Sequence, residues 1–137
     1  MKIFSEKIKY GISAIFELAK NQFKGYIQIK DIAQAQKIPQ NYLEQLLITL
    51  KKSELVESMR GMQGGYRLKK LPNEIKIIDV IRALDGPFII FENSENSEVF
   101  RNYWSKIEQK LNDLFSETFE ALLNEENVLH KKLFFQI

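Results

Sequence analysis

Cysteine is absent from this chain of 137 residues, and histidine occurs once, as His130. The absence of cysteine excludes disulfides, thiolate nucleophiles and iron–sulfur ligation, and it also excludes zinc sites of the common thiolate type. With a single imidazole, a transition-metal site made only of protein side chains is not expected. The sequence therefore predicts a protein without a cofactor or a bound metal.

Long apolar runs are also missing. No stretch approaches the roughly 20 apolar residues that a membrane-spanning helix needs, and charge interrupts Met1–Glu6 before a signal-peptide core can form. We therefore expect a cytoplasmic protein with no membrane partner. Apolar residues make up 45% and charged residues 28% of the chain, which is typical of one globular domain with an appended oligomerisation element.

Acidic and basic residues are unevenly distributed, although the net charge is only +2. Residues 1–70 contain 13 Lys and Arg against 6 Asp and Glu, and residues 71–137 contain 7 against 12, so the halves carry +7 and −5. A positive field concentrated in the first half is typical of a surface that binds a polyanion. Scattered, solvated lysines on an ordinary surface remain the alternative on charge alone.

The first half contains three segments with helical periodicity. Apolar residues recur at helical spacing over Glu6–Lys20, and a shorter helix is expected over Lys30–Gln36. Lys37-Ile38-Pro39 interrupts the pattern, and a further helix follows from about Pro39 to Ser53. A buried Ile38 between two short helices is typical of the turn of a helix-turn-helix.

The helix expected at Pro39–Ser53 has an amide-rich outward side. Its inward positions, which are apolar, are Tyr42 or Leu43, Leu46, Leu47 and Leu50. Its wholly or partly outward positions are Gln40, Asn41, Glu44, Gln45, Ile48 and Thr49. Side-chain amides can exchange two hydrogen bonds with an adenine edge in the major groove, which favours DNA reading. Gln and Asn are also ordinary neutral surface residues, and this alternative stays open for the isolated helix.

A hairpin with a glycine-rich tip follows this helix. Leu55–Ser58 and Tyr66–Lys69 alternate apolar and polar residues with a period of two, and three of the six glycines fall in the turn between them. Glycine allows positive φ and close backbone approach, so an Arg60-Gly61 tip can lie along a phosphate backbone or enter a minor groove. A nucleotide-binding loop is disfavoured, because such loops lead into a helix N-terminus and this one leads into a strand. Before the hairpin, Tyr26–Ile29 is expected to be a turn or a brief strand.

The second half contains a short helix, a connector and a long amphipathic helix. We expect the short helix at Asp79–Leu84, the end of its domain at Gly86-Pro87, and a polar connector from Glu92 to Ser97. From Glu98 to Phe115, apolar residues recur at near-heptad spacing, and they are Phe100, Tyr103, Trp104, Ile107, Leu111, Leu114 and Phe115. Packing of this stripe against a second chain is favoured over folding back, because the stripe is rich in aromatic residues and follows a complete domain.

Two apolar segments have no evident partner in the sequence. Phe88–Phe91 must pack on another part of the protein; lining of an effector pocket is a weaker interpretation than core or dimer packing. A further short helix is expected at Thr118–Asn124, followed by a tail from Val128 to Ile137. The tail's Leu133-Phe134-Phe135 is too short for a convincing membrane-surface helix, so docking on the protein itself is favoured.

These elements predict a mainly α fold with a small β-hairpin. We place a winged helix-turn-helix DNA-binding domain at residues 1–87, a connector at 88–97, and a dimerisation helix with a C-terminal helix and tail at 98–137. No Ser/His/Asp arrangement, lysine-based site or metal-ligand spacing indicates an enzyme.

The chain resembles the Rrf2 family of bacterial transcriptional regulators, which are homodimeric winged helix-turn-helix proteins. The resemblance rests mainly on Ile38–Leu46, Leu55–Gly61 and Gly64–Leu68, with further support from Ile32-Ala33, Ile75 and Asp79–Ile81. It implies a recognition helix in the major groove that carries Gln40, Asn41, Tyr42, Glu44 and Gln45. It also implies that the Arg60-Gly61 wing tip follows the minor groove and that the helix from Glu98 forms the dimer.

The chain departs from the family at the place where many members bind an iron–sulfur cluster. Those members carry three cysteines between the wing domain and the long helix, whereas this chain has none. Arg101 lies three residues before Trp104, where some cluster-binding members have a histidine. The resemblance therefore implies a cluster-free member, and some such members respond through partner proteins or by other means.

We therefore expect a sequence-specific regulator, and more specifically a repressor that binds a palindromic operator in double-stranded DNA as a homodimer. Lysines near the first helix and the turn would neutralise phosphates, namely Lys2, Lys7, Lys9 and Lys30. Glu44 would accept a hydrogen bond from cytosine N4, or it would orient Gln45 or a nearby lysine. The alternative is a protein-interaction module that docks on a metabolic enzyme or on another regulator, with DNA binding secondary.

Overall fold

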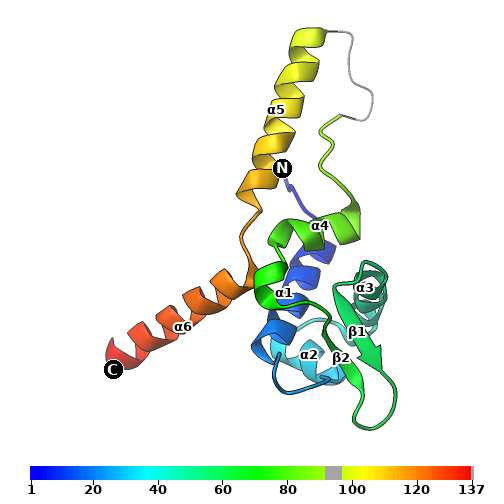
Figure 1. The fold of residues 1–137 in the computed structure, drawn as a ribbon, viewed down its shortest axis with the longest axis vertical. Helices are drawn as coiled ribbons and strands as arrows, with labels where there is room; N and C mark the ends of the chain where they lie inside the picture. The colour runs from blue at the N-terminus through cyan, green and yellow to red at the C-terminus, as the bar shows by residue number, and fades with distance from the viewer. Residues whose placement is uncertain (92–96, 137) are drawn as a thin grey trace.

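The computed structural model describes residues 1–91 and 97–136, so residues 92–96 of the predicted connector lie outside the described part. The fold is mainly helical with a two-stranded antiparallel hairpin, as the sequence predicts (Figure 1). In chain order the elements are α1 (Glu6–Lys20), α2 (Ile29–Gln36), α3 (Gln40–Lys52), β1 (Val56–Met59), β2 (Gly65–Leu68), the 3-10 helix η1 (Pro72–Glu74), α4 (Ile77–Asp85), α5 (Glu98–Leu114) and α6 (Phe119–Gln136). None of the helices described here is both long and apolar enough to cross a membrane.

Helix α1 is the centre of the hydrophobic core, because α2, α3, α4 and α6 all contact it. Its apolar residues recur on one side of the helix, where Ala14, Ile15 and Ala19 are completely buried. Leu47 from α3 and Val80 from α4 belong to the same cluster. The helix begins and ends at the residues that its periodicity predicts.

A tight turn joins α2 to α3 and completes the helix-turn-helix. Lys37 ends α2 with φ of 55° and ψ of 48°, a left-handed conformation that turns the chain sharply. Ile38 follows and is only 4% exposed, which confirms it as the buried residue of the turn. Pro39 then precedes the first turn of α3, where its missing N–H leaves no donor unsatisfied.

The hairpin is attached to the body of the domain along one edge. Strands β1 and β2 begin and end within one residue of the bounds that period-two alternation predicts. Ile27, in the loop between α1 and α2, pairs with Tyr66 of β2 through two backbone hydrogen bonds of 2.8 Å each. The brief strand predicted at Tyr26–Ile29 is therefore an isolated bridge, and it fixes where the hairpin lies.

The apolar segment Phe88–Phe91 packs along α5, which answers a question that the sequence left open. The ring of Phe88 stacks on Phe115 with centroids 5.7 Å apart, and Phe91 meets Trp104 edge to face at 5.2 Å. Figure 1 shows α5 projecting beyond the other helices, with this segment running beside it. The segment therefore packs on the long helix, as the favoured interpretation of the sequence expects.

Helix α6 corrects two predictions about the C-terminal part of the chain. It runs continuously over Phe119–Gln136, where a short helix at Thr118–Asn124 and a separate tail were predicted. No glycine or proline follows Asn124, and the next residues are largely Glu, Leu and Lys, which favour a helix. The side chain of Leu133 is 60% exposed, so this residue is not docked on its own chain as predicted.

The beginning of α6 belongs to the same core as the N-terminal helices. Phe119 is completely buried, and its N–H donates to the carbonyl of Ile75 at 3.0 Å. The N–H of Ile77 in turn donates to the carbonyl of Glu117 at 2.9 Å. The chain thus leaves the domain along α5 and returns to it at α6, so residues 98–137 do not form a core separate from that of residues 1–87.

Replacing Phe119 by alanine is expected to lower the free energy of unfolding by about 3–5 kcal/mol, because the change removes a buried ring and leaves a cavity. Asn124→Ala, at an exposed position of the same helix, should change it by less than about 0.5 kcal/mol. Urea denaturation followed by circular dichroism measures both variants. Equal stability of the two would show that α6 lies outside the core.

Candidate nucleic-acid interface

Helix α3 presents a polar side to solvent and an apolar side to the core. Its buried residues are Leu43, Leu46, Leu47 and Leu50, which decides between the two predicted inward positions in favour of Leu43. Its exposed residues include Gln40, Asn41, Glu44 and Gln45. Four neighbouring side chains that can donate or accept hydrogen bonds therefore face outward on the first two turns of one helix.

Tyr42 lies at the edge between these two sides and supports the beginning of α3. It is 39% exposed, and its ring meets Tyr10 of α1 edge to face at 5.6 Å. The ammonium of Lys9 lies 5.1 Å from the centre of the Tyr10 ring. This aromatic contact with α1, which the sequence did not predict, holds the N-terminal turn of α3 in place.

The four lysines that were predicted to contact phosphates have different surroundings. Lys7 pairs with Asp85 of α4 at 2.5 Å, and Lys9 pairs with Glu6 at 2.8 Å, which lowers the pKa of the Glu6 carboxyl. Lys7 and Lys9 are two positions apart along α1, so the two side chains leave the helix on nearly opposite sides. Lys2 and Lys30 have no ion-pair partner in the described part of the chain.

Glu44 lies between the outward side of α3 and the base of the hairpin. Burial raises the pKa of Tyr66 above its ordinary value, and the negative charge of Glu44 raises it further. Across residues 1–91 and 97–136, Glu44 forms neither an ion pair with a lysine nor a hydrogen bond with Gln45. The carboxylate is thus left available to an external donor, such as the amino group of a cytosine.

The hairpin tip carries an exposed arginine on a turn that needs glycine. Arg60 is exposed, and Gly61 has φ of 107°, a conformation that side chains other than glycine rarely adopt. Met62 is 93% exposed on the same turn, and the sequence analysis did not single it out. Its apolar side chain between Gly61 and Gln63 was the sequence signal that could have drawn attention to it.

The beginning of β2, next to the turn of the hairpin, lies too close to its neighbours for any side chain at Gly65. A Cβ atom there would lie 2.2 Å from the carbonyl oxygen of Ile27, and φ is 139°. Both values follow from the backbone pairing of Ile27 with Tyr66. Glycine at this position therefore allows the hairpin to join the edge of the loop between α1 and α2.

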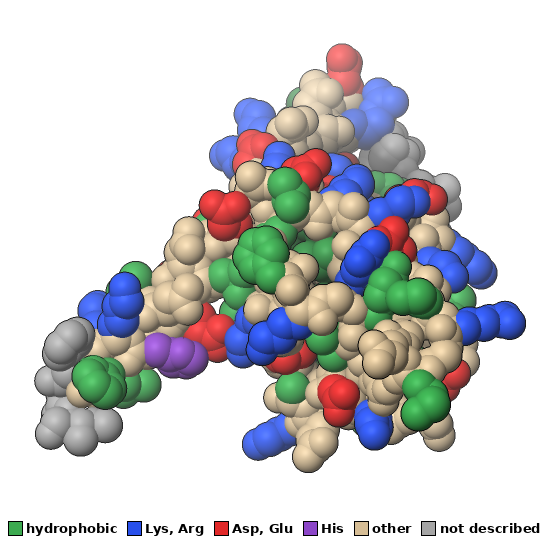
Figure 2. All heavy atoms as spheres, turned by 60° about the horizontal axis from the view of Figure 1, so that its bottom comes forward, with side chains coloured by type: hydrophobic (Ala, Val, Ile, Leu, Met, Phe, Trp, Pro, Cys, Tyr) green, Lys and Arg blue, Asp and Glu red, His purple; other side chains and the backbone are tan. Residues whose placement is uncertain are grey.

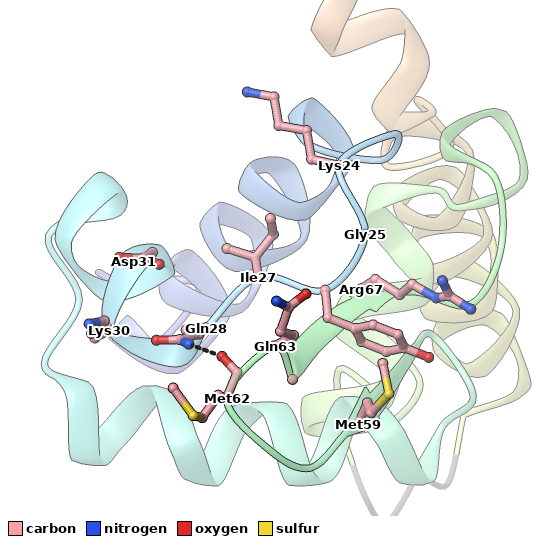
Figure 3. Close-up of a pocket in the computed structure, with 12 residues that line it drawn as sticks. Lys24, Gly25, Ile27, Gln28, Lys30, Asp31, Met59, Met62, Gln63 and Arg67 are labelled. Carbon is pink, nitrogen blue, oxygen red and sulfur yellow. Dashed lines mark hydrogen bonds between the residues drawn. The ribbon is translucent and has the colours of Figure 1, made fainter.

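Two side chains also connect the hairpin to that loop (Figure 3). The guanidinium of Arg67 lies 4.3 Å from the centre of the Tyr26 ring and donates to Glu57 at 2.6 Å. The amide of Gln28 donates to the carbonyl of Met62 at 2.8 Å. Sequence reasoning missed the contacts of Tyr26 and Gln28 with the hairpin, because only the tertiary structure brings these residues together, whereas Arg67 and Glu57 are opposite residues of the hairpin itself.

An open groove of about 680 Å³ lies between the hairpin and the loop. Its lining includes the basic residues Lys24, Lys30 and Arg67 and a single acidic residue, Asp31. Figure 2, which turns the lower side of Figure 1 forward, shows Lys and Arg side chains projecting around the margin of this face. The face that carries the hairpin thus has the charge that a polyanion requires.

The apolar stripe of α5 is incompletely covered in the single chain. Phe100 is 56%, Tyr103 49% and Leu114 75% exposed, and no residue of α5 is fully buried. The remaining members of the stripe are only half-buried, and they are Trp104, Ile107, Leu111 and Phe115. This exposure of aromatic and aliphatic side chains along one helix is typical of a surface that another chain covers.

Comparison with known proteins places this geometry among DNA-binding regulators. A family model described as "Rrf2: Iron-dependent Transcriptional regulator" matches residues 4–125. The chain is 39% identical over 119 residues to the HTH-type transcriptional regulator CymR of Bacillus subtilis, with 86% of each protein covered. It is also 33% identical over 123 residues to a putative HTH-type transcriptional regulator of Synechocystis, covering 85% of this chain and 84% of that protein.

Solved structures show the same arrangement of elements. The structure of CymR, the global cysteine regulator of B. subtilis, superposes with a TM-score of 0.81 at 37% identity and covers 91% of this chain and 98% of that one. The structure of T. potens IscR gives a TM-score of 0.77 at 34% identity, with 92% and 88% covered. The winged helix-turn-helix fold predicted from the sequence is thereby confirmed.

The residues of this chain do not fit the iron that the family description names. The sequence has no cysteine and one histidine, and no group of three or more His, Cys, Asp or Glu side chains among the described residues could hold a metal ion. Iron–sulfur ligation normally uses thiolates, with histidine as an occasional substitute. The side chains present therefore give no support for a role of bound iron in DNA binding.

Gly65→Ala is expected to weaken attachment of the hairpin, because the new Cβ would collide with the backbone of Ile27 and the φ of 139° would be strained. We expect faster amide hydrogen exchange at Ile27 and Tyr66, whose N–H groups form the bridge. Gly25→Ala, also at positive φ but with nothing within 4 Å of its Cβ, separates collision from backbone strain. Equal exchange in the two variants would rule out the close contact.

Proposed function

This chain belongs to the Rrf2 family of DNA-binding transcriptional regulators, and from that membership we propose that it is a cytoplasmic repressor that binds a palindromic operator as a homodimer. One observation carries the proposal. The arginine-tipped hairpin is joined to the segment Tyr26–Gln28, which leads directly into α2, and α2 packs against α3, so a reading helix and a wing have a fixed relation to each other.

The exposed side chains of α3 have the chemistry for the major groove. The amides of Gln40, Asn41 and Gln45 can each pair with the N6 and N7 of adenine, and Glu44 can accept from the N4 of cytosine. Each such contact discriminates between bases by about 1–3 kcal/mol. Phosphate contacts from Lys2 and Lys30 would add affinity without sequence preference.

The wing has the chemistry for the minor groove. Its tip is narrow because Gly61 allows a sharp turn, and Arg60 next to it carries a guanidinium that is attracted by the negative potential of a narrow minor groove. The exposed thioether of Met62 can lie against the sugar walls. Recognition would therefore use both grooves from one protomer.

The homodimer follows from the exposed stripe of α5. A second copy that packs its own α5 against Phe100, Tyr103 and Leu114 would bury apolar surface that the single chain leaves in water. Such pairing has two-fold symmetry, and two recognition helices related in this way bind half-sites about 34–36 Å apart, or a multiple of that spacing. A palindromic operator is the DNA sequence that matches this symmetry.

We propose further that repression is controlled without an iron–sulfur cluster, because the chain lacks the thiolates for one. The signal would then arrive through a protein co-regulator or another ligand of the dimer. Selection of bound genomic fragments, followed by mobility-shift assays with competitor DNA, tests the proposal as a whole. Nanomolar, competitor-resistant binding to a palindrome is the expected result. Weak, salt-labile binding to every fragment would favour the protein-interaction module.

Arg60→Ala is expected to cost about 1–3 kcal/mol of binding free energy for the preferred operator and to relax base preference only where the wing touches. Lys30→Ala is the control for a phosphate contact. It should weaken binding to all sequences alike and reduce the slope of log affinity against log salt by about 1. Fluorescence anisotropy with an operator library measures both. An unchanged library profile for Arg60→Ala would remove Arg60 from base reading.

Tyr103→Glu is expected to dissociate the dimer, because it places a carboxylate in the exposed apolar stripe of α5. Gln109→Glu adds the same charge at an exposed position on the opposite side of the helix and should leave the dimer intact. Sedimentation equilibrium measures the association of each variant. If both variants remain dimeric, or the unmodified protein is a monomer, the α5 interface is wrong.

A further inference from the structure

Gln28 occupies the N-cap position of α2 but does not cap the helix. Its backbone is extended, with φ of −70° and ψ of 147°, and its side chain forms no hydrogen bond with the first turn. Ser, Thr, Asp and Asn are favoured at this position because their short side chains reach the free N–H groups of the helix. The longer amide of Gln28 instead reaches the hairpin, where it donates to the carbonyl of Met62 at 2.8 Å (Figure 3).

This contact is made at the tip of the hairpin, whereas the other attachments are made nearer its base. Ile27 pairs with Tyr66, and Arg67 stacks over Tyr26. Within the described part of the chain, the hydrogen bond from the Gln28 amide to Met62 is the only one between residues 60–63 and the body of the domain. The other bond of the turn, from the N–H of Gly64 to the carbonyl of Gly61, is internal to the hairpin.

The contact also joins the tip to a part of the domain that is itself fixed. Helix α2, which starts directly after Gln28, is held in the core by Ile32 and Ala33, and it packs against α3. A tip that is bound at Met62 therefore has a defined position relative to the recognition helix. Without that bond, the exposed turn that carries Arg60 keeps only its base attachments and gains freedom of movement.

We propose that Gln28 is a positioning residue for DNA recognition, one that holds the wing tip so that Arg60 enters the minor groove in register with α3. The inference rests on the proposed function, because it concerns how the two reading elements act together. The amide touches no base itself. Its effect is to reduce the conformational freedom that the tip would otherwise lose when DNA binds.

The main experiment compares Gln28→Ala with Gln36→Ala, a matched change on the same helix. Gln36 also donates one side-chain hydrogen bond, to Glu17 at 2.9 Å, but it does not contact the hairpin. We expect Gln28→Ala to reduce base preference under the wing by about three- to tenfold while leaving preference under α3 unchanged. Gln36→Ala should leave both unchanged. In an Arg60→Ala background, Gln28→Ala should have no further effect on preference.

Gln28→Ser separates positioning from stability. Serine can cap α2 through its hydroxyl but is too short to reach Met62, so Tm should equal or exceed that of the unmodified protein. The preference under the wing should nevertheless fall as it does for Gln28→Ala. Amide exchange without DNA gives a second readout: the tip residues 61–64 should exchange faster in both Gln28 variants than in Gln36→Ala.

Each outcome is decisive. If the unmodified protein is selective and Gln28→Ala keeps the full preference under the wing, the inference fails and the proposed function stands. A uniform loss of affinity in Gln28→Ala and Gln36→Ala alike would also overturn it, because it would indicate a structural role only. If the unmodified protein shows no sequence preference, the proposed function fails and the inference fails with it.

Discussion

The backbone pairing of Ile27 with Tyr66 is the contact on which the proposed DNA-binding face depends. It joins the loop before α2 to strand β2 of the wing. Its two hydrogen bonds of 2.8 Å leave no room for a side chain at Gly65. The hairpin is thereby fixed relative to α2, which in turn packs against α3. The wing is thus attached to a rigid part of the domain, because buried leucines and isoleucines fix α2 and α3 in the core.

The core also explains why α5 projects. Phe119 must return to the cluster around α1, so the long helix has the anchored Phe88–Phe91 segment before it and a buried residue after it. Its N-terminal part extends beyond the other helices (Figure 1), with an apolar stripe that its own domain leaves incompletely covered. These attachments to the domain thus fix the direction of α5. In the proposed dimer, α5 would in turn set the distance between the DNA-binding faces of the two protomers.

The sequence predicted those parts of the structure that depend on local periodicity. The bounds of α1 and the hairpin follow from repeats of 3.6 or two residues, and these repeats arise because one side of each element faces the core. The buried Ile38 follows from its place in the turn between two short helices. The extension of α6 was missed because the helix was expected to end at Asn124, although no glycine or proline there breaks a helix. The family resemblance, and not periodicity, supplied the functional interpretation.

Side-chain contacts across the tertiary structure were beyond the reach of the sequence. Lys7 and Lys9 look equivalent as basic residues near a reading helix, yet they leave α1 on nearly opposite sides and each is paired with a carboxylate. Their charge is therefore partly neutralised within the protein, whereas Lys30, beside the groove at the wing, has no such partner among the described residues. The net charge of +7 on residues 1–70 therefore overstates the positive potential that DNA would meet at α1. It also hides the difference between α1, where the lysines are paired, and the wing, where Lys30 is not paired among the described residues.

A regulator without a resident cluster has to change its affinity for DNA through geometry. Two distances determine whether a palindrome is bound well, the spacing between the two recognition helices and the position of each wing tip relative to its own helix. The first would depend on α5 and the second on the Gln28–Met62 hydrogen bond. Since that bond is at the surface and competes with water, a small free energy can break it, so the wing is the more easily adjusted of the two.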